Sequence, residues 1–178
     1  MMMNSLTDVL SVGHLPLHNR SAGGANMDRY ETMKDYAEEH GLSVEEKPLK
    51  YNDGRIRGNK VLIRSDIPTR IQKAAVLCEE IGHYETAVGN ILDQSVTANR
   101  KQELRGRIWA YNRLIGLTGI IEAYRSGCRN RYEMAELLEV PEDVLQDALD
   151  YYHSRYGLFT QLDNYVIYFE PLGVMELV

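Results

Sequence analysis

Residues 69–86 carry the pattern that most constrains how this chain can fold. Apolar or small residues recur every three or four positions, which predicts a helix with one buried face. Asp66 and Pro68 precede this stretch, and a capping aspartate followed by a proline is typical of a helix start. The expected buried stripe comprises Ile71, Ala75, Cys78 and Gly82. The sequence therefore predicts one long amphipathic helix near the middle of the chain.

The segments around this helix predict an α+β fold. Residues 27–40 have helical spacing and end before Gly41, and residues 97–115 predict a second long helix. Short strands are expected at 42–46, 55–57 and 60–64, because turn residues separate them. We therefore expect a helix, a short antiparallel sheet and two long helices.

Shorter elements follow. Helices are expected over 120–125, near 132–138 and from 141 to 152, and the turn between the last two has helix-turn-helix proportions. Strands are expected at 165–169 and 174–177, which predicts a C-terminal β-hairpin. The sequence thus divides into a disordered tail (1–26), a first domain (27–116), a helix-turn-helix-like helical lobe (117–157) and C-terminal strands (158–178).

Composition excludes several classes of protein. The net charge of −6 over 178 residues argues against a general nucleic-acid binder, which needs a concentrated cationic surface. The two cysteines are too few for a disulfide framework and predict free thiols in a reducing compartment. No stretch approaches the roughly 20 apolar residues that span a bilayer, and the N-terminus lacks the features of a signal peptide. We therefore expect a cytoplasmic protein without a membrane segment.

The charged residues of the 69–86 helix suggest a metal site. Glu79 and His83 are four residues apart, so their side chains point to the same side of a helix. Glu103, on the next helix, is the best candidate for the third ligand that a catalytic site requires. Glu80 is displaced from Glu79 by about 100° around the helix. In H-E-x-x-H peptidases a glutamate with this offset acts as the general base.

Two alternatives stay open on spacing alone. Glutamates at adjacent positions and a Glu-x-x-x-His pair are also typical of a solvated helix face. Tyr84 and Glu85 either assist the site or serve packing and solvation. Gly82, directly before His83, would let a neighbouring element pack closely against the helix.

Residues 75–83 and 103–110 together resemble the ImmA/IrrE metallopeptidases, which phages, mobile elements and some bacterial chromosomes encode. The first run looks like the metal helix of that family. The second is similar to its pattern of a glutamate ligand, a small residue and an aromatic–alanine pair, here Glu103, Gly106, Trp109 and Ala110. The resemblance extends from about residue 27 to the C-terminus and includes the order of elements.

The resemblance implies a small zincin-like, gluzincin-like metallopeptidase domain over residues 27–116. In it Glu79, His83 and Glu103 would bind one zinc ion and Glu80 would be the general base. The implied activity is endopeptidase cleavage of a helix-turn-helix transcriptional repressor, which derepresses prophage, mobile-element or stress genes.

Glu79 is the departure from the family motif, because it stands where H-E-x-x-H has its first histidine. A second anionic ligand makes the metal a weaker Lewis acid. Oxygen-rich ligation also shifts the preference from zinc towards manganese. One alternative function is therefore a catalytically inactive relative that regulates the repressor by binding.

A third hypothesis is a DNA-binding regulator that uses residues 131–152. We rank it last, because the helix that would enter the groove carries four acidic residues and no Lys or Arg. These are Glu142, Asp143, Asp147 and Asp150. We therefore expect a protein partner and no direct contact with nucleic acid.

Overall fold

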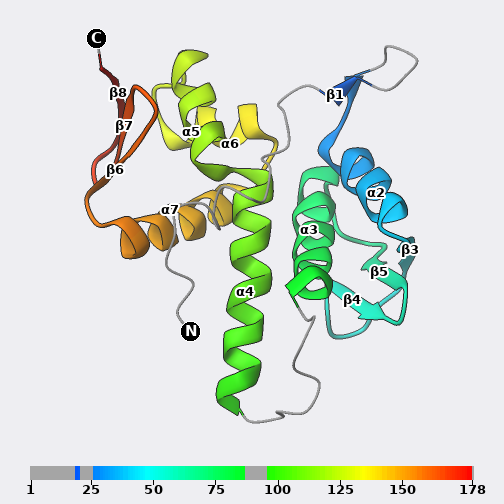
Figure 1. The fold of residues 1–178 in the computed structure, drawn as a ribbon. Helices are drawn as coiled ribbons and strands as arrows, with labels where there is room; N and C mark the ends of the chain where they lie inside the picture. The colour runs from blue at the N-terminus through cyan, green and yellow to red at the C-terminus, as the bar shows by residue number, and fades with distance from the viewer. Residues whose placement is uncertain (1–18, 21–25, 87–95, 178) are drawn as a thin grey trace. The chain divides into compact units, whose positions relative to one another are not determined.

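The computed structural model describes residues 19–20, 26–86 and 96–177 (Figure 1). They form a mixed α+β protein, as the sequence predicts. The described residues belong to two compact units, His18–Ala110 and Tyr111–Val178. The tail predicted over residues 1–26 lies mostly outside the described residues. Within it, β1 (Asn19–Arg20) pairs antiparallel with β2 (Asn26–Met27).

The first unit contains a three-stranded sheet in the order β3-β5-β4. The expected antiparallel pairing is confirmed for β4 and β5, which Gly58 joins in a tight turn at φ +61°. It is wrong for β3, which runs parallel to β5 and makes the sheet mixed. Strand β5, with buried Val61 and Ile63, lies between the other two strands, and its two neighbours run in opposite directions. The strands are β3 (Ser43–Lys47), β4 (Gly54–Arg57) and β5 (Lys60–Arg64).

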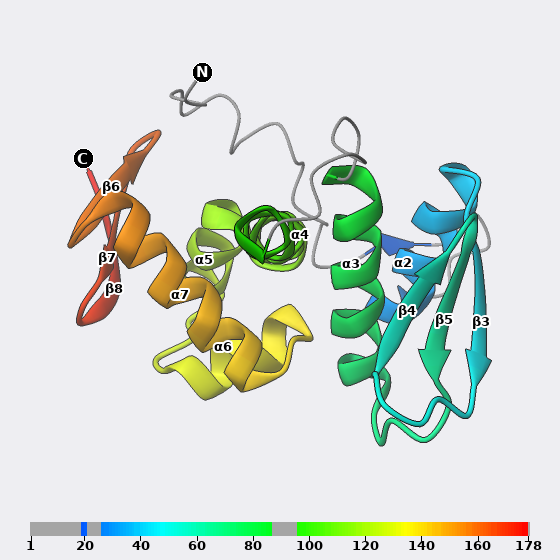
Figure 2. The ribbon, with the colours of Figure 1, turned by 90° about the horizontal axis from the view of Figure 1, so that it is seen from below.

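Two helices, α2 (Arg29–Glu39) and α3 (Arg70–Thr86), pack beside this sheet (Figure 2). Asp28 caps α2, because its carboxylate accepts the backbone N–H of Glu31 at 3.0 Å. The same carboxylate pairs with Arg70 at the start of α3 and so links the two helix N-termini. The α3 helix has nearly the bounds expected from the sequence. Its buried face differs in one residue, since Ile71 in the first turn is 39% exposed.

The second unit begins within the long helix α4 (Val96–Leu114). Three helices follow: α5 (Gly116–Arg125), α6 (Arg131–Leu138) and α7 (Glu142–Tyr156). The expected hairpin is present as β7 and β8, but an additional strand, β6, pairs with β7 and completes an antiparallel sheet. The strands are β6 (Phe159–Leu162), β7 (Tyr165–Phe169) and β8 (Leu172–Glu176).

Helix α7 supplies much of the core of this unit, through Leu145, Ala148, Leu149 and Tyr152. The Tyr152 hydroxyl donates a buried hydrogen bond of 3.1 Å to Oδ1 of Asn112. The four acidic residues on the opposite side of α7 are exposed. Both cysteines are free thiols, as expected. None of the helices in the described ranges combines the length and the apolar character needed to cross a membrane.

Candidate metal centre

Helix α3 brings two of the predicted ligands together. Glu79 and His83 are one turn apart, and Oε1 of Glu79 lies 3.9 Å from Nε2 of His83. Buried residues on the opposite side of the helix, including Cys78 and Ile81, hold this part of α3 in the core. The imidazole and the carboxylate therefore face the pocket with little freedom of the backbone.

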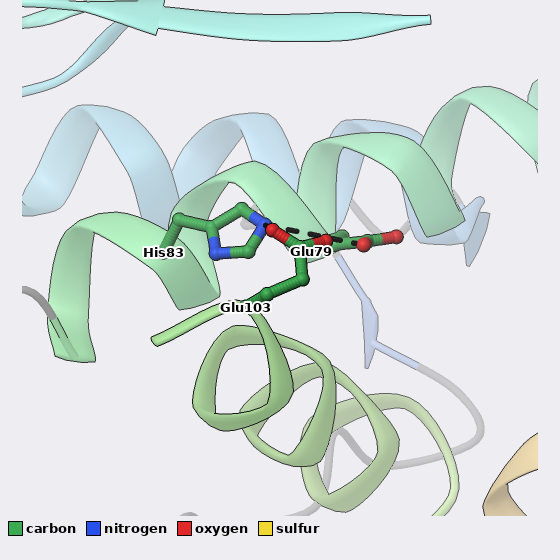
Figure 3. Close-up of side chains that lie close together, drawn as sticks. All are labelled: Glu79, His83 and Glu103. Carbon is green, nitrogen blue, oxygen red and sulfur yellow. Dashed lines mark ion pairs between the residues drawn. The ribbon is translucent and has the colours of Figure 1, made fainter. Parts of the chain in front are cut away.

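Helix α4 supplies the third predicted ligand. Oε2 of Glu103 lies 3.6 Å from Nε2 of His83, and the three side chains converge from the two helices (Figure 3). One ligand atom from each residue lies within 4.8 Å of the other two. In a tetrahedral zinc site with bonds near 2.0 Å, ligand atoms are about 3.3 Å apart. The three residues fit a divalent ion after a contraction on the order of 1 Å, which flexible carboxylates permit.

Two glycines allow the helices that carry the ligands to approach each other. A Cβ on Gly82 would collide with the backbone carbonyl oxygen of Gly106 and lie 3.3 Å from its Cα. A Cβ on Gly106 would overlap the ring of His83, with Cε1 only 2.6 Å away. Gly106 therefore leaves the space that the imidazole fills. This confirms the close packing expected at Gly82.

The residues after Gly106 fix α4 in its place within the first unit. Trp109 and Ala110 are buried, and the indole ring lies 5.8 Å from the ring of Tyr36 on α2. The Sγ atom of Cys78 lies 4.0 Å from the carbonyl oxygen of Ala110. The aromatic–alanine pair noted in the sequence thus anchors the helix that presents Glu103.

The predicted general base, Glu80, lies beside the three ligand candidates and lines the same pocket. Burial and the nearby negative charges of Glu79 and Glu103 raise the pKa of Glu80 to about 7. A hydrogen bond donated by the backbone N–H of Ile56 opposes this shift in the pKa. Gly54 makes room for the side chain, because a Cβ there would lie 2.7 Å from Cγ of Glu80.

Arg107 is a residue of the site that the sequence reasoning missed. Its Nε atom lies 3.2 Å from Oε1 of Glu79, and its Nη2 atom lies 3.5 Å from Oε1 of Glu103. The guanidinium thus interacts with both candidate carboxylate ligands. The signal was available, because Arg107 follows Glu103 by four residues and so shares its helix face.

These side chains line one pocket of about 610 Å³. Its lining includes Glu79, Glu80, His83, Glu103 and Arg107, together with residues of β4 and of the preceding turn. Tyr84 and Glu85 are not among the residues that line it. Gly54 leaves space for the Glu80 side chain and Ile56 donates a hydrogen bond to it. The sequence contained no sign of either contact, because both depend on how β4 packs against α3.

Comparisons with known proteins do not identify a family. No protein-family model matches the chain, and no curated protein matches it. The resemblance of residues 75–83 and 103–110 to ImmA/IrrE proteins therefore stays a prediction, and function has to be argued from the site.

Proposed function

We propose that this protein is a metal-dependent endopeptidase in which Glu79, His83 and Glu103 bind a divalent ion and Glu80 is the general base. One observation carries the proposal: three ligand groups from two helices converge beside a fourth carboxyl group with a raised pKa. Perturbed carboxyl groups in pockets are typical of catalytic sites. Zinc suits the imidazole ligand, and manganese also suits the two carboxylates.

The side chains support peptide hydrolysis in the following way. A bound zinc ion would supply a Lewis acid for the peptide carbonyl. Glu80 takes a proton from the attacking water and delivers it to the leaving amine. In the metal-free site, burial and the charges of Glu79 and Glu103 raise the pKa of Glu80. A bound divalent ion would offset the charges of these two carboxylates and leave burial as the cause that favours the protonated form. The N–H of Ile56 holds the carboxylate against β4 during these steps.

The proposed substrate is a helix-turn-helix transcriptional repressor, as the resemblance to ImmA/IrrE proteins implies. Cleavage would derepress prophage, mobile-element or stress genes. The exposed acidic side of α7 supports a protein partner over DNA, because Glu142, Asp143, Asp147 and Asp150 would repel phosphates.

Arg107 favours a second candidate, a catalytically inactive protein that regulates the repressor by binding. The guanidinium interacts with Glu79 and Glu103 and so supplies positive charge where a metal ion would. In this candidate the arginine replaces the metal. The two candidates differ in one measurable property, the metal content of the purified protein.

The test is metal analysis combined with cleavage. Protein purified without chelator is expected to hold close to one divalent ion per chain, and Glu79→Ala or His83→Ala is expected to abolish it. Glu80→Gln should keep the metal and lose cleavage of a co-expressed helix-turn-helix repressor from a neighbouring gene. Glu85→Gln is the matched control, because this glutamate lies on the same helix but outside the lining of the pocket.

Three results would each contradict a different part of this proposal. Wild-type protein without metal, and without a rise in melting temperature on addition of zinc, would favour the inactive binding protein. Equal cleavage by Glu80→Gln and wild type would exclude Glu80 as the base. Equal loss of cleavage in Glu85→Gln would show that any charge change on α3 disturbs the protein.

A further inference from the structure

Strand β4 presents an open edge to the pocket of the candidate centre. Among the described residues it pairs only with β5, and it lies on the side of the sheet nearest α3 (Figure 2). The carbonyl of Asp53 accepts the N–H of Arg64 on β5, whereas the N–H of Ile56 reaches Glu80. Backbone groups alternate in direction along an antiparallel strand. Gly54 and Ile56 therefore direct their backbone groups away from β5.

The two arginines of β4 lie on the other face of the strand. An added Cβ on Gly54 would contact Glu80, so Gly54 faces α3, and side chains alternate along a strand. Arg55 and Arg57 are accordingly exposed on the outer face of the sheet, and Arg55 also borders the pocket. Neither has an ion-pair or hydrogen-bond partner among the described residues.

The other cations on this outer face are paired. The ion pairs are Lys47–Glu45 (2.8 Å), Lys60–Glu45 (2.6 Å) and Arg64–Asp53 (2.9 Å). Two unpaired guanidinium groups, two residues apart, therefore stand at the edge of the strand that borders the pocket. An arrangement of this kind is complementary to carboxylates with the same spacing.

We propose that Arg55 and Arg57 select an extended protein segment with acidic residues at two positions separated by one residue. Such a segment would pair with the edge of β4 by strand addition, through the backbone groups of Gly54 and the carbonyl of Ile56, because Glu80 already accepts the N–H of Ile56. In strand addition, backbone bonds give affinity and alternate side chains give specificity. Residues directly opposite each other on adjacent strands share a face. The two acidic side chains would then lie beside the arginines, and the residue between them would face the pocket.

This inference rests on the proposed peptidase function, whose substrate it describes. Glu79, Glu80 and Glu103 lie on the α3 side of β4, and of the two arginines only Arg55 lines the same pocket. Arginine pairs also bind phosphate. A peptide is favoured over nucleic acid because the chain has a net charge of −6 and because the strand edge offers backbone groups that match a peptide.

The test measures binding of labelled peptides to the full-length Glu80→Gln protein, with and without zinc. Three degenerate peptide pools share one design and contain Asp-x-Asp, Asn-x-Asn or Lys-x-Lys at fixed positions. By fluorescence anisotropy the Asp pool should bind about threefold to tenfold more tightly than the Asn pool, as two exposed ion pairs allow. This preference should shrink as salt is raised to about 0.3 M.

Charge-reversed variants test whether the preference for the Asp pool depends on Arg55 and Arg57. Arg55→Glu/Arg57→Glu should reverse the preference towards the Lys pool. Lys47→Glu/Lys50→Glu makes the same change in net charge outside the lining of the pocket and should keep the preference for Asp. Three outcomes would overturn the inference. The protein could bind the three pools equally, it could bind none of them, or both variants could lose the preference for the Asp pool to the same extent. Tighter binding of duplex DNA than of the Asp pool would overturn it as well.

The binding measurement separates this inference from the proposed activity. If wild type cleaves no peptide but its preference for the Asp pool depends on Arg55 and Arg57, the peptide-binding inference is supported and the proposed peptidase activity is rejected. If wild type cleaves a peptide library without enrichment of acidic residues around the cleavage sites, the peptidase activity is supported and the inferred preference for acidic peptides is wrong.

Discussion

Gly106→Ala should weaken metal binding more than it weakens the fold. The new Cβ would lie 2.6 Å from Cε1 of His83. Carbon atoms in ordinary contact are about 3.5–4.0 Å apart, so the imidazole has to retreat by on the order of 1 Å. Metal–ligand distances tolerate only about 0.2 Å. The substitution therefore removes His83 from ligand position without changing the chemistry of any ligand.

Two free-energy changes can be compared for this variant: the loss of folding stability and the loss of metal-binding free energy. Overpacking costs about 1–3 kcal/mol, and replacing a helical glycine by alanine recovers about 1 kcal/mol. The metal-free variant should thus be less stable than wild type by only about 0–2 kcal/mol. Disturbing the support of a metal ligand typically weakens affinity about 10- to 100-fold. A 100-fold loss removes up to about 2.7 kcal/mol of the stabilisation that zinc provides.

The assay is competition with a chromophoric zinc chelator, combined with thermal unfolding in chelator and in zinc. Gly173→Ala is the control, because no atom lies within 4 Å of an added Cβ there and Gly173 lies far from the site in sequence. If Gly106→Ala binds zinc as tightly as wild type, the imidazole is not held in ligand position by the space at Gly106, and His83 loses its support as a ligand.

Two further predictions concern charge at the centre. Arg107→Gln should tighten zinc binding about two- to fivefold, because an exposed cation that interacts with Glu79 and Glu103 is removed; unchanged or weaker binding in the chelator competition would contradict this. The pKa of Glu80 is raised from 4.5 to about 7, so the fold favours the protonated carboxyl. Metal-free wild type should therefore lose stability relative to Glu80→Gln as pH rises from about 4.5 through about 7. A pH-independent difference between their melting temperatures would refute this interpretation of Glu80.

Local signals made much of the fold predictable. Helix α3 was expected over residues 69–86 and spans Arg70–Thr86, because its spacing of apolar residues is a local signal. The expected cap, Asp66, was wrong: the hydroxyl of Thr69 accepts the N–H of Gln72 at 3.1 Å, and Pro68 precedes the helix. The approach of Glu79 to His83 follows from helical geometry in the same way. The approach of Glu103 to His83 could not be predicted from one helix alone. It depends on the close packing of α3 against α4, which Gly82 and Gly106 allow.

Strand pairing was less predictable, because alternation shows which face of a strand is buried and does not name its neighbour. For this reason the parallel pairing of β3 with β5 was missed. The missed strand β6 had a local signal, since Asp163-Asn164 is a favourable two-residue hairpin turn and Asp163 has φ +51°. The hydrogen bond from Ile56 to Glu80 had none, because it depends on the position of β4 against α3.

Arg107 affects the charge of the candidate centre, in which Glu79 stands at the position of the first histidine of an H-E-x-x-H motif. A centre with two neutral histidines and one glutamate has a formal charge of −1 without metal and +1 with a divalent ion. Glu79, Glu103 and the guanidinium of Arg107, with neutral His83, give the same two values. The arginine thus offsets the additional negative charge of Glu79, and its positive charge should lower metal affinity while it maintains Lewis acidity. In Arg107→Gln, zinc should therefore bind more tightly and peptide cleavage should be slower. Faster cleavage would instead show that the guanidinium blocks the centre, as the inactive binding protein requires.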